Sequence, residues 1–115
     1  MCSARSPRRN GPGPQTIERI AVTLKAMSDP VRLRILYNLQ EGELCVGDLV
    51  DRLDCSQANV SKHLAILKQS GLVASRAEGP IHYYYIADPM VEGVCDTVCS
   101  AVEARMSGQL RSSRF

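Results

Sequence analysis

The sequence predicts a mainly α-helical domain that carries one β-hairpin, and three observations support this fold class. Apolar residues recur with helical spacing in several successive segments between residues 16 and 69 and again near the C-terminus. Two runs rich in Val, Ile and Tyr, at residues 72–76 and 81–86, flank the turn Ala77-Glu78-Gly79-Pro80 and indicate a hairpin. The chain has 115 residues, which fits one compact domain.

The first two helices are predicted on either side of Ser28-Asp29-Pro30. Helical spacing of apolar residues predicts the first helix from Thr16 to Met27. Asp29 is a good N-cap and Pro30 suits a first helical position, so the second helix begins there. Apolar residues lie nearly all round this second helix, which indicates a central, buried position, and Gly42 ends it.

A short third helix and a fourth helix follow, separated by a tight turn. Val46, Leu49, Val50 and Leu53 have the i, i+3, i+4, i+7 spacing of one helical face. Asp54-Cys55 forms the turn, and Ser56 can cap the fourth helix. The inner face of this helix consists of Val60, Leu64 and Leu67, and Gly71 ends it.

The last helix begins at Asp88-Pro89 and runs to about Met106. The resulting order, α-α-α-α-β-β-α, with two short helices before a hairpin, is that of a winged helix-turn-helix. We therefore expect a flexible basic arm at residues 1–15, the folded domain at 16–106 and a flexible tail at 107–115.

The fourth helix is the predicted DNA-reading element, because the second helix of such a pair enters the major groove. Gln and Asn side chains can bind adenine edges, Ser can bind a base or a phosphate, and Lys binds phosphate. The segment 56–76 contains basic residues and no acidic ones, although a merely solvated helix face is the alternative. The predicted DNA contacts are Ser56, Gln57, Asn59, Ser61, Lys62 and His63, with Arg76 and His82 as the candidates in the wing.

Overall charge and motifs exclude several classes of protein. The net charge of +2 is too small to prove a nucleic-acid partner by itself. The sequence contains neither a run long enough for a transmembrane helix nor an apolar stretch behind the N-terminal arginines that would make a signal peptide. No nucleophile–base pair or phosphate-binding loop is visible. We expect a cytoplasmic protein without a membrane partner, and not an enzyme.

Three segments, at residues 28–36, 42–49 and 56–64, resemble the ArsR/SmtB family of repressors, and the resemblance extends over residues 16–103. It implies a homodimer formed through the terminal helices that binds double-stranded operator DNA. It also implies release from DNA when a metal or metalloid binds, or when a thiol is modified. Pro80 and Ile81 stand where wings of the family often carry Arg or Lys, so we expect the wing to contribute little.

Five cysteines are candidates for sensing. Structural disulfides are not expected in the cytosol. Relative to the arsenic-type motif Glu-Leu-Cys-Val-Cys-Asp, this chain keeps Cys45 but has Gly47 at the second thiol position. Zinc-type members use Asp and His on the last helix, which here contains Asp96 but no His. A nitrogen–oxygen site for zinc is therefore not expected.

Cys95 and Cys99 have the i, i+4 spacing that places both thiols on one face of the last helix, where they can bind one soft ion. Cys45 is the first choice for a third ligand, Cys2 the second and Cys55 the third. The alternative is that these thiols are only small apolar side chains in a stripe of valines on the last helix.

The sequence thus predicts a homodimeric transcriptional repressor that leaves operator DNA when trivalent arsenic or antimony binds its cysteines. It requires no cofactor. A thiol-redox or persulfide-responsive repressor of the same fold is the first alternative. A helical dimerisation module without a role at DNA is an alternative of another class.

Overall fold

The structure is a computed structural model that describes residues 11–108. The described part contains five helices and a small three-stranded sheet, which confirms the predicted fold class. Most of the expected basic arm and tail lie outside the described residues. The elements in chain order are α1 (Pro14–Met27), α2 (Pro30–Leu39), β1 (Leu44–Cys45), α3 (Val46–Leu53), α4 (Gln57–Gln69), β2 (Val73–Glu78), β3 (Ile81–Ile86) and α5 (Met90–Met106).

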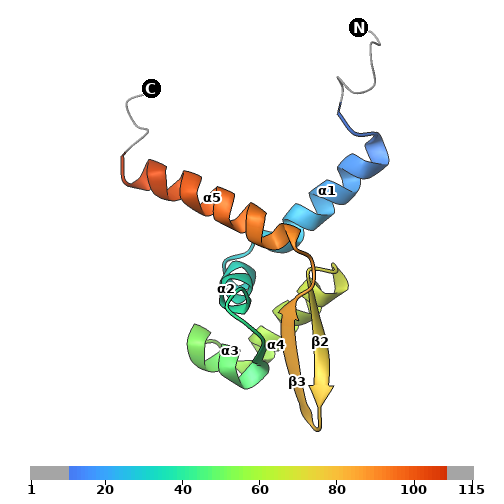
Figure 1. Cartoon of the computed structure of the whole chain (residues 1–115), viewed down its shortest axis with the longest axis vertical. Helices are drawn as coiled ribbons and strands as arrows, with labels where there is room; N and C mark the ends of the chain where they lie inside the picture. Colours follow the sequence, from blue (N-terminus) through green and yellow to red (C-terminus); the bar gives the residue numbers. More distant parts are fainter. Residues whose placement is uncertain (1–10, 109–115) are drawn as a thin grey trace, which may run out of the picture.

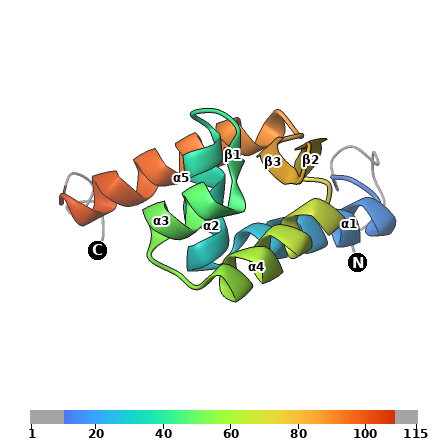
Figure 2. The same cartoon turned by 90° about the horizontal axis from the view of Figure 1, so that it is seen from below.

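The helices form two groups around one core. In Figure 1, α1 and α5 diverge from a common point above α2, and α3, α4 and the β2–β3 hairpin lie below that point. Figure 2 shows α2, α3 and α4 packed together when the molecule is seen from below. Core side chains on four helices, Leu36, Leu49, Leu64 and Val91, are at most 1% exposed. Burial of these apolar surfaces holds the two helices of the helix-turn-helix against α2.

Both predicted helix caps are present. Asp29 Oδ2 accepts hydrogen bonds from the backbone N–H groups of Val31 at 2.9 Å and Arg32 at 3.1 Å. Ser56 Oγ accepts one from the N–H of Asn59 at 3.1 Å. These caps satisfy donors that the first turn of a helix leaves free, so they fix where α2 and α4 begin.

The turn between α3 and α4 depends on Asp54. Its φ of 55° is in the left-handed region, which aspartate tolerates better than most residues, and this conformation ends α3. Helix α4 can therefore begin three residues later, at Gln57, and run at a different angle.

The sheet has the order β1-β3-β2, with both pairings antiparallel. The hairpin register pairs Val73 with Ile86 at its base and Glu78 with Ile81 at its tip. The two-residue strand β1 was not expected, and it pairs Leu44 with Tyr84 on the other edge of β3. This pairing attaches the hairpin to the start of α3, and so to the helix-turn-helix.

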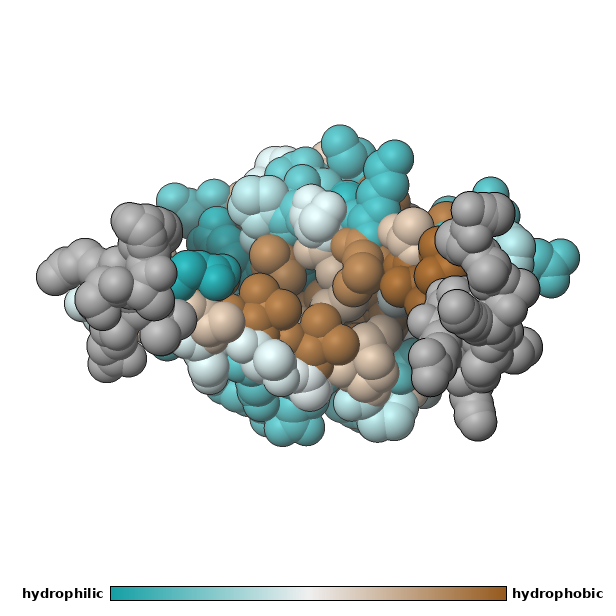
Figure 3. All heavy atoms as spheres, turned by 90° about the horizontal axis from the view of Figure 1, so that it is seen from above, coloured by the Kyte–Doolittle hydropathy of each residue, from teal (hydrophilic) through white to brown (hydrophobic). Residues whose placement is uncertain are grey.

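One face of the molecule is apolar although it is exposed. Figure 3, seen from above, shows apolar side chains gathered across the side that α1 and α5 form. We call this surface the upper apolar face. Leu24 of α1 and Val98 and Val102 of α5 are exposed on it and line one pocket. No helix within residues 11–108 is long and apolar enough to cross a membrane. An exposed apolar face on a small protein marks a contact with another molecule.

Candidate functional site

The N-terminal half of α4 presents polar side chains to solvent. Ser56, Gln57, Ser61 and Lys62 are exposed and Asn59 is half-buried, whereas the opposite side of the helix contributes Val60, Leu64 and Leu67 to the core. The core therefore fixes the rotation of α4 about its axis. The predicted DNA contacts on α4 other than His63 thus lie on or beside its exposed side, as a groove-binding helix requires.

The structure corrects the prediction for His63. We expected this side chain to contact bases, yet the residue is only 7% exposed. Arg32 of α2 donates a hydrogen bond from Nη1 to His63 Nδ1 at 3.0 Å, while Asp29 Oδ2 lies 3.8 Å away, beyond hydrogen-bond distance. An arginine only donates, so His63 is the acceptor in this contact. His63 therefore joins α4 to the start of α2, and its side chain is buried where the prediction needed it exposed.

Arg76 on the wing is engaged by two carboxylates. Its Nη2 lies 2.8 Å from Glu43 Oε1, and its Nε donates to the same carboxylate at 2.9 and 3.2 Å. Glu78 lies 3.7 Å from Nη1, and the guanidinium lies 5.0 Å from the centre of the Tyr83 ring. The hydrogen bond to Glu43 raises the pKa of Arg76. Glu43 and Glu78 therefore compete with a phosphate for this guanidinium, whose side chain is 46% exposed.

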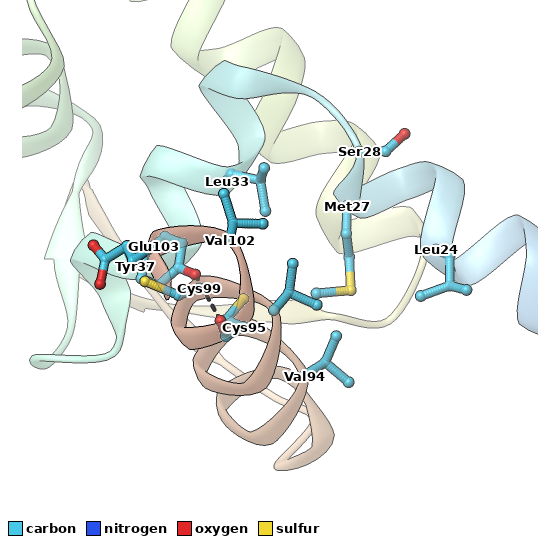
Figure 4. Close-up of a pocket in the computed structure, with 11 residues that line it drawn as sticks. Leu24, Met27, Ser28, Leu33, Tyr37, Val94, Cys95, Cys99, Val102 and Glu103 are labelled. Atoms are coloured by element: carbon cyan, nitrogen blue, oxygen red, sulfur yellow. Dashed lines mark hydrogen bonds between the residues drawn. The ribbon is translucent and has the colours of Figure 1, made fainter. Parts of the chain in front are cut away.

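Cys95 and Cys99 lie on one face of α5, as their spacing predicted, and both line one pocket. The pocket has a volume of about 470 Å³ and lies between α1, α2 and α5. Figure 4 shows the two thiols on neighbouring turns of α5, with Tyr37 of α2 beside them. Cys95 is 2% exposed and Cys99 is half-buried. Apart from Ser28, Tyr37, Glu103 and the two cysteines, the lining side chains are apolar: Leu24, Met27, Leu33, Val94, Val98 and Val102.

Tyr37 connects the thiols to α2, and we did not anticipate its position. Its hydroxyl donates a hydrogen bond to the backbone carbonyl of Cys95 at 2.8 Å. Burial, and then the neighbouring Cys95 and Cys99, raise the pKa of Tyr37 to about 12. A tyrosine on a helix that is predicted to be buried needs a partner for its hydroxyl, and this requirement was the available signal in the sequence.

The pKa of Cys95 is raised, mainly by burial and then by the charge of Asp96, while a hydrogen bond with Tyr37 opposes the increase. Its thiol is therefore protonated at neutral pH and becomes a sulfur ligand only when a proton leaves.

The other cysteines are not brought to this pair. Cys45 lies in β1 and donates from Sγ to Asp48 Oδ2 at 3.3 Å. The Sγ of Cys55 donates to the carbonyl of Leu53 at 3.5 Å, and Cys55 packs against the core. Within residues 11–108, no three His, Cys, Asp or Glu side chains are grouped so that they could hold a metal ion. The predicted set Cys95, Cys99 and Cys45 is therefore not assembled in one subunit, and Cys2 lies outside the described residues.

Comparison with known proteins gives the family. Residues 29–75 match the family described as bacterial regulatory protein, arsR family. The HTH-type transcriptional repressor SmtB of Mycobacterium tuberculosis is 37% identical over 102 residues, which cover 87% of this chain and 76% of that repressor. The chain belongs to the ArsR family. The ArsR-family match includes α2, α3 and α4 and the start of the wing, so it contains the whole helix-turn-helix.

Two further ArsR-family similarities are informative. The arsenical resistance operon repressor of Escherichia coli is 49% identical over 61 residues, which cover 51% of this chain and 52% of that repressor. The solution structure of a homodimeric winged helix-turn-helix DNA-binding domain from Mycobacterium bovis, a possible ArsR-family regulator, matches with a TM-score of 0.73 and 28% identity. That match covers 91% of this chain and 94% of the other. These ArsR-family relatives are transcriptional regulators, not enzymes.

Proposed function

We propose that this ArsR-family protein is a homodimeric repressor that leaves operator DNA when a trivalent arsenic or antimony compound binds Cys95 and Cys99. The observation that carries the proposal is the position of the two thiols. They lie in a pocket bounded by α1 and α5, the helices that present the upper apolar face, and by α2, which packs on the recognition helix. A ligand in this pocket contacts α1 and α5, the helices of the proposed dimer interface, and also α2, against which α4 packs.

The upper apolar face supports the homodimer. Val98 is 54% exposed and Leu24 is 48% exposed, so this face is costly to leave in water. The Mycobacterium bovis domain that shares this fold is described as homodimeric. In the proposed dimer, the two copies of α4 enter successive major grooves of the operator, about 34 Å apart.

The exposed residues of α4 support the DNA contacts. In this proposal Gln57 and Asn59 bind base edges, Ser56 and Ser61 bind bases or phosphates, and Lys62 binds a phosphate. The free N–H groups of the first turn favour a further phosphate. The wing contributes little, since Arg76 is held by Glu43.

A chain of contacts supports the coupling between pocket and DNA. Met27 and Ser28, at the corner between α1 and α2, line the pocket. Directly behind this corner, Arg32 Nε donates to the carbonyl of Ala26 at 2.6 Å, and Arg32 Nη1 donates to His63 of α4 at 3.0 Å. A ligand that separates α5 from α1 shifts this corner and hence the orientation of α4. It releases DNA only if it binds the weak-binding conformer more tightly.

The test is operator binding by fluorescence anisotropy, with and without arsenite or antimonite. A coupling free energy of about 1–3 kcal/mol predicts a 5- to 150-fold weaker affinity with ligand. The Cys95→Ser, Cys99→Ser double variant should bind operator normally and no longer respond. Cys55→Ser is the matched control, because Cys55 lies outside the pocket, and it should respond as the original does. Unchanged affinity with every ligand rejects the proposal, and a double variant that still responds places the site elsewhere.

A further inference from the structure

We propose that three arginines of the basic arm, Arg5, Arg8 and Arg9, bind backbone phosphates of the DNA beside the contacts of α4. These arginines lie outside the described residues. The inference rests on the DNA binding proposed above and adds a second contact site for the same partner. Two features of the described part support it: its net charge and the place where α1 begins.

The part of the chain that the structure describes is acidic overall. The whole chain has 14 basic and 12 acidic residues. Residues 1–10 contain three arginines, residues 109–115 contain two, and neither segment contains an acidic residue. Residues 11–108 therefore carry nine basic side chains against twelve acidic ones, which is a net charge of −3. A net negative domain repels DNA at long range, whereas affinity for DNA depends largely on cations that neutralise phosphates.

Most basic side chains of this domain already have partners within it. Five of the nine bond to other groups of the domain: Arg32, Arg34, Arg52, Lys68 and Arg76. Within residues 11–108, α4 therefore offers Lys62 to a phosphate, since Lys68 donates to Ser75 Oγ at 2.9 Å. Exposed carboxylates on and directly after the preceding helix α3 oppose this cation: Asp48, Asp51 and Asp54. Tight binding to DNA thus needs basic groups from outside residues 11–108.

Helix α1 begins on the side of the molecule that carries α4. Figure 2 shows α1 and α4 together on one side and α5 on the other. The first turns of α1 lie beside the end of α4, because Glu18 and Thr23 line a surface hollow together with Gln69. Gly13 is the N-cap of α1 and Pro14 opens the helix. The chain that precedes α1 therefore joins the domain on the side of α4.

The arginines are close enough in the chain to reach the DNA that α4 contacts. Arg9 and Arg5 precede Pro14 by five and nine residues, which span at most about 18 and 32 Å. Helix α4 has 13 residues and is therefore about 20 Å long. The chain before α1 can thus extend along α4 to the phosphates beside it. A guanidinium keeps its charge and binds phosphate through paired N–H donors, and such contacts are independent of the base sequence.

Fluorescence anisotropy with a duplex of mixed sequence measures these contacts over a range of salt concentrations. The Arg5→Gln, Arg8→Gln, Arg9→Gln triple variant should reduce the slope of log affinity against log salt concentration by about two to three, because each phosphate contact contributes about 0.9. Its affinity at low salt should fall roughly tenfold or more. The corresponding triple lysine variant keeps the charge and should keep the slope. An unchanged slope in the glutamine variant overturns the inference, and a reduced slope in the lysine variant contradicts binding to phosphate.

The matched control removes the same charge from the other end of the chain. Arg105 lies in the last turn of α5, and Arg111 and Arg114 follow that helix. Because α5 lies on the side of the molecule away from α4, the triple glutamine variant of these residues should reduce the slope by less than about one. Equal reductions in the two triple glutamine variants would be an effect of net charge alone and would overturn the inference.

The response to arsenite and antimonite separates this inference from the proposed function. A DNA complex that ignores both compounds, while the glutamine variant of the basic arm loses slope, rejects the proposed function and leaves the inference standing. Release by arsenite together with an unchanged slope in that variant overturns the inference alone. An original chain that does not bind the duplex at low salt rejects both.

Discussion

The buried position of His63 makes a prediction that separates a structural residue from a DNA-reading one. His63→Ala removes a ring that is only 7% exposed and the hydrogen bond that Arg32 donates to it at 3.0 Å. A hydrogen bond to a charged group contributes about 1.5–3 kcal/mol, and a lost buried ring adds to this. We expect His63→Ala to lower the free energy of unfolding by about 2–3 kcal/mol, which for a domain of this size lowers Tm by roughly 10–20 °C.

Urea denaturation followed by circular dichroism measures this stability, and anisotropy at low temperature measures operator affinity. His63→Ala should keep the ratio between its affinities for the operator and for operators with single base changes. Asn59→Ala is the matched control on the same helix: its stability should change by less than about 0.5 kcal/mol, while discrimination at one base pair falls by about 1–3 kcal/mol. A His63→Ala protein of unchanged stability that loses discrimination would falsify the structural role of His63.

Three further predictions concern charge and thiol chemistry. Lys62→Gln should weaken operator binding and reduce the slope of log affinity against log salt concentration by about one. Arg76→Gln should change that slope far less, because two carboxylates already contact Arg76. Salt titrations followed by anisotropy measure both slopes. Backbone hydrogen bonds, mainly the one from the N–H of Arg32, lower the pKa of Asp29 in the folded protein. The ionised Asp29 therefore stabilises the fold above the pKa of the unfolded chain, near 4, and this stabilisation is lost as the pH falls through the lower pKa of the folded protein. Urea denaturation between pH 6 and pH 2 should therefore show that the free energy of unfolding falls more for the original chain than for Asp29→Asn. Parallel plots of this free energy against pH would contradict the prediction. Alkylation followed by mass spectrometry should modify half-buried Cys99 before Cys95 at pH 8, since burial both shields Cys95 and raises its pKa, and the reverse order would refute the placement of the thiols.

Much of the fold could be predicted because its signals are local. Asp29 and Ser56 cap the helices that they were expected to cap, and the i, i+4 spacing of Cys95 and Cys99 placed both on one pocket. Each of these features depends on residues within one or two helical turns. The strand β1 was missed, since two residues are too few to show alternation and their partner strand lies about 40 residues later.

The candidate site was only partly predictable, because several of its side chains are governed by distant partners. The residue type and the position of His63 on α4 suit a base contact, but Arg32 of α2 turns the ring inwards. Arg76 is a free cation in the sequence, yet Glu43 lies beside it once β1 joins the sheet near the hairpin. In both cases a contact between residues more than thirty positions apart decided the role.

Short segments of the chain were enough to predict the order of helices and hairpin, the polar end of α4 and the position of two thiols on one face of α5, because helical periodicity and capping are encoded locally. The packing of the helices determines which thiols remain apart, the bond from Tyr37 of α2 to α5, and the apolar pocket beside the cysteines. Pockets and buried contacts arise from how helices pack, and packing depends on the summed shape of side chains that are distant in the sequence.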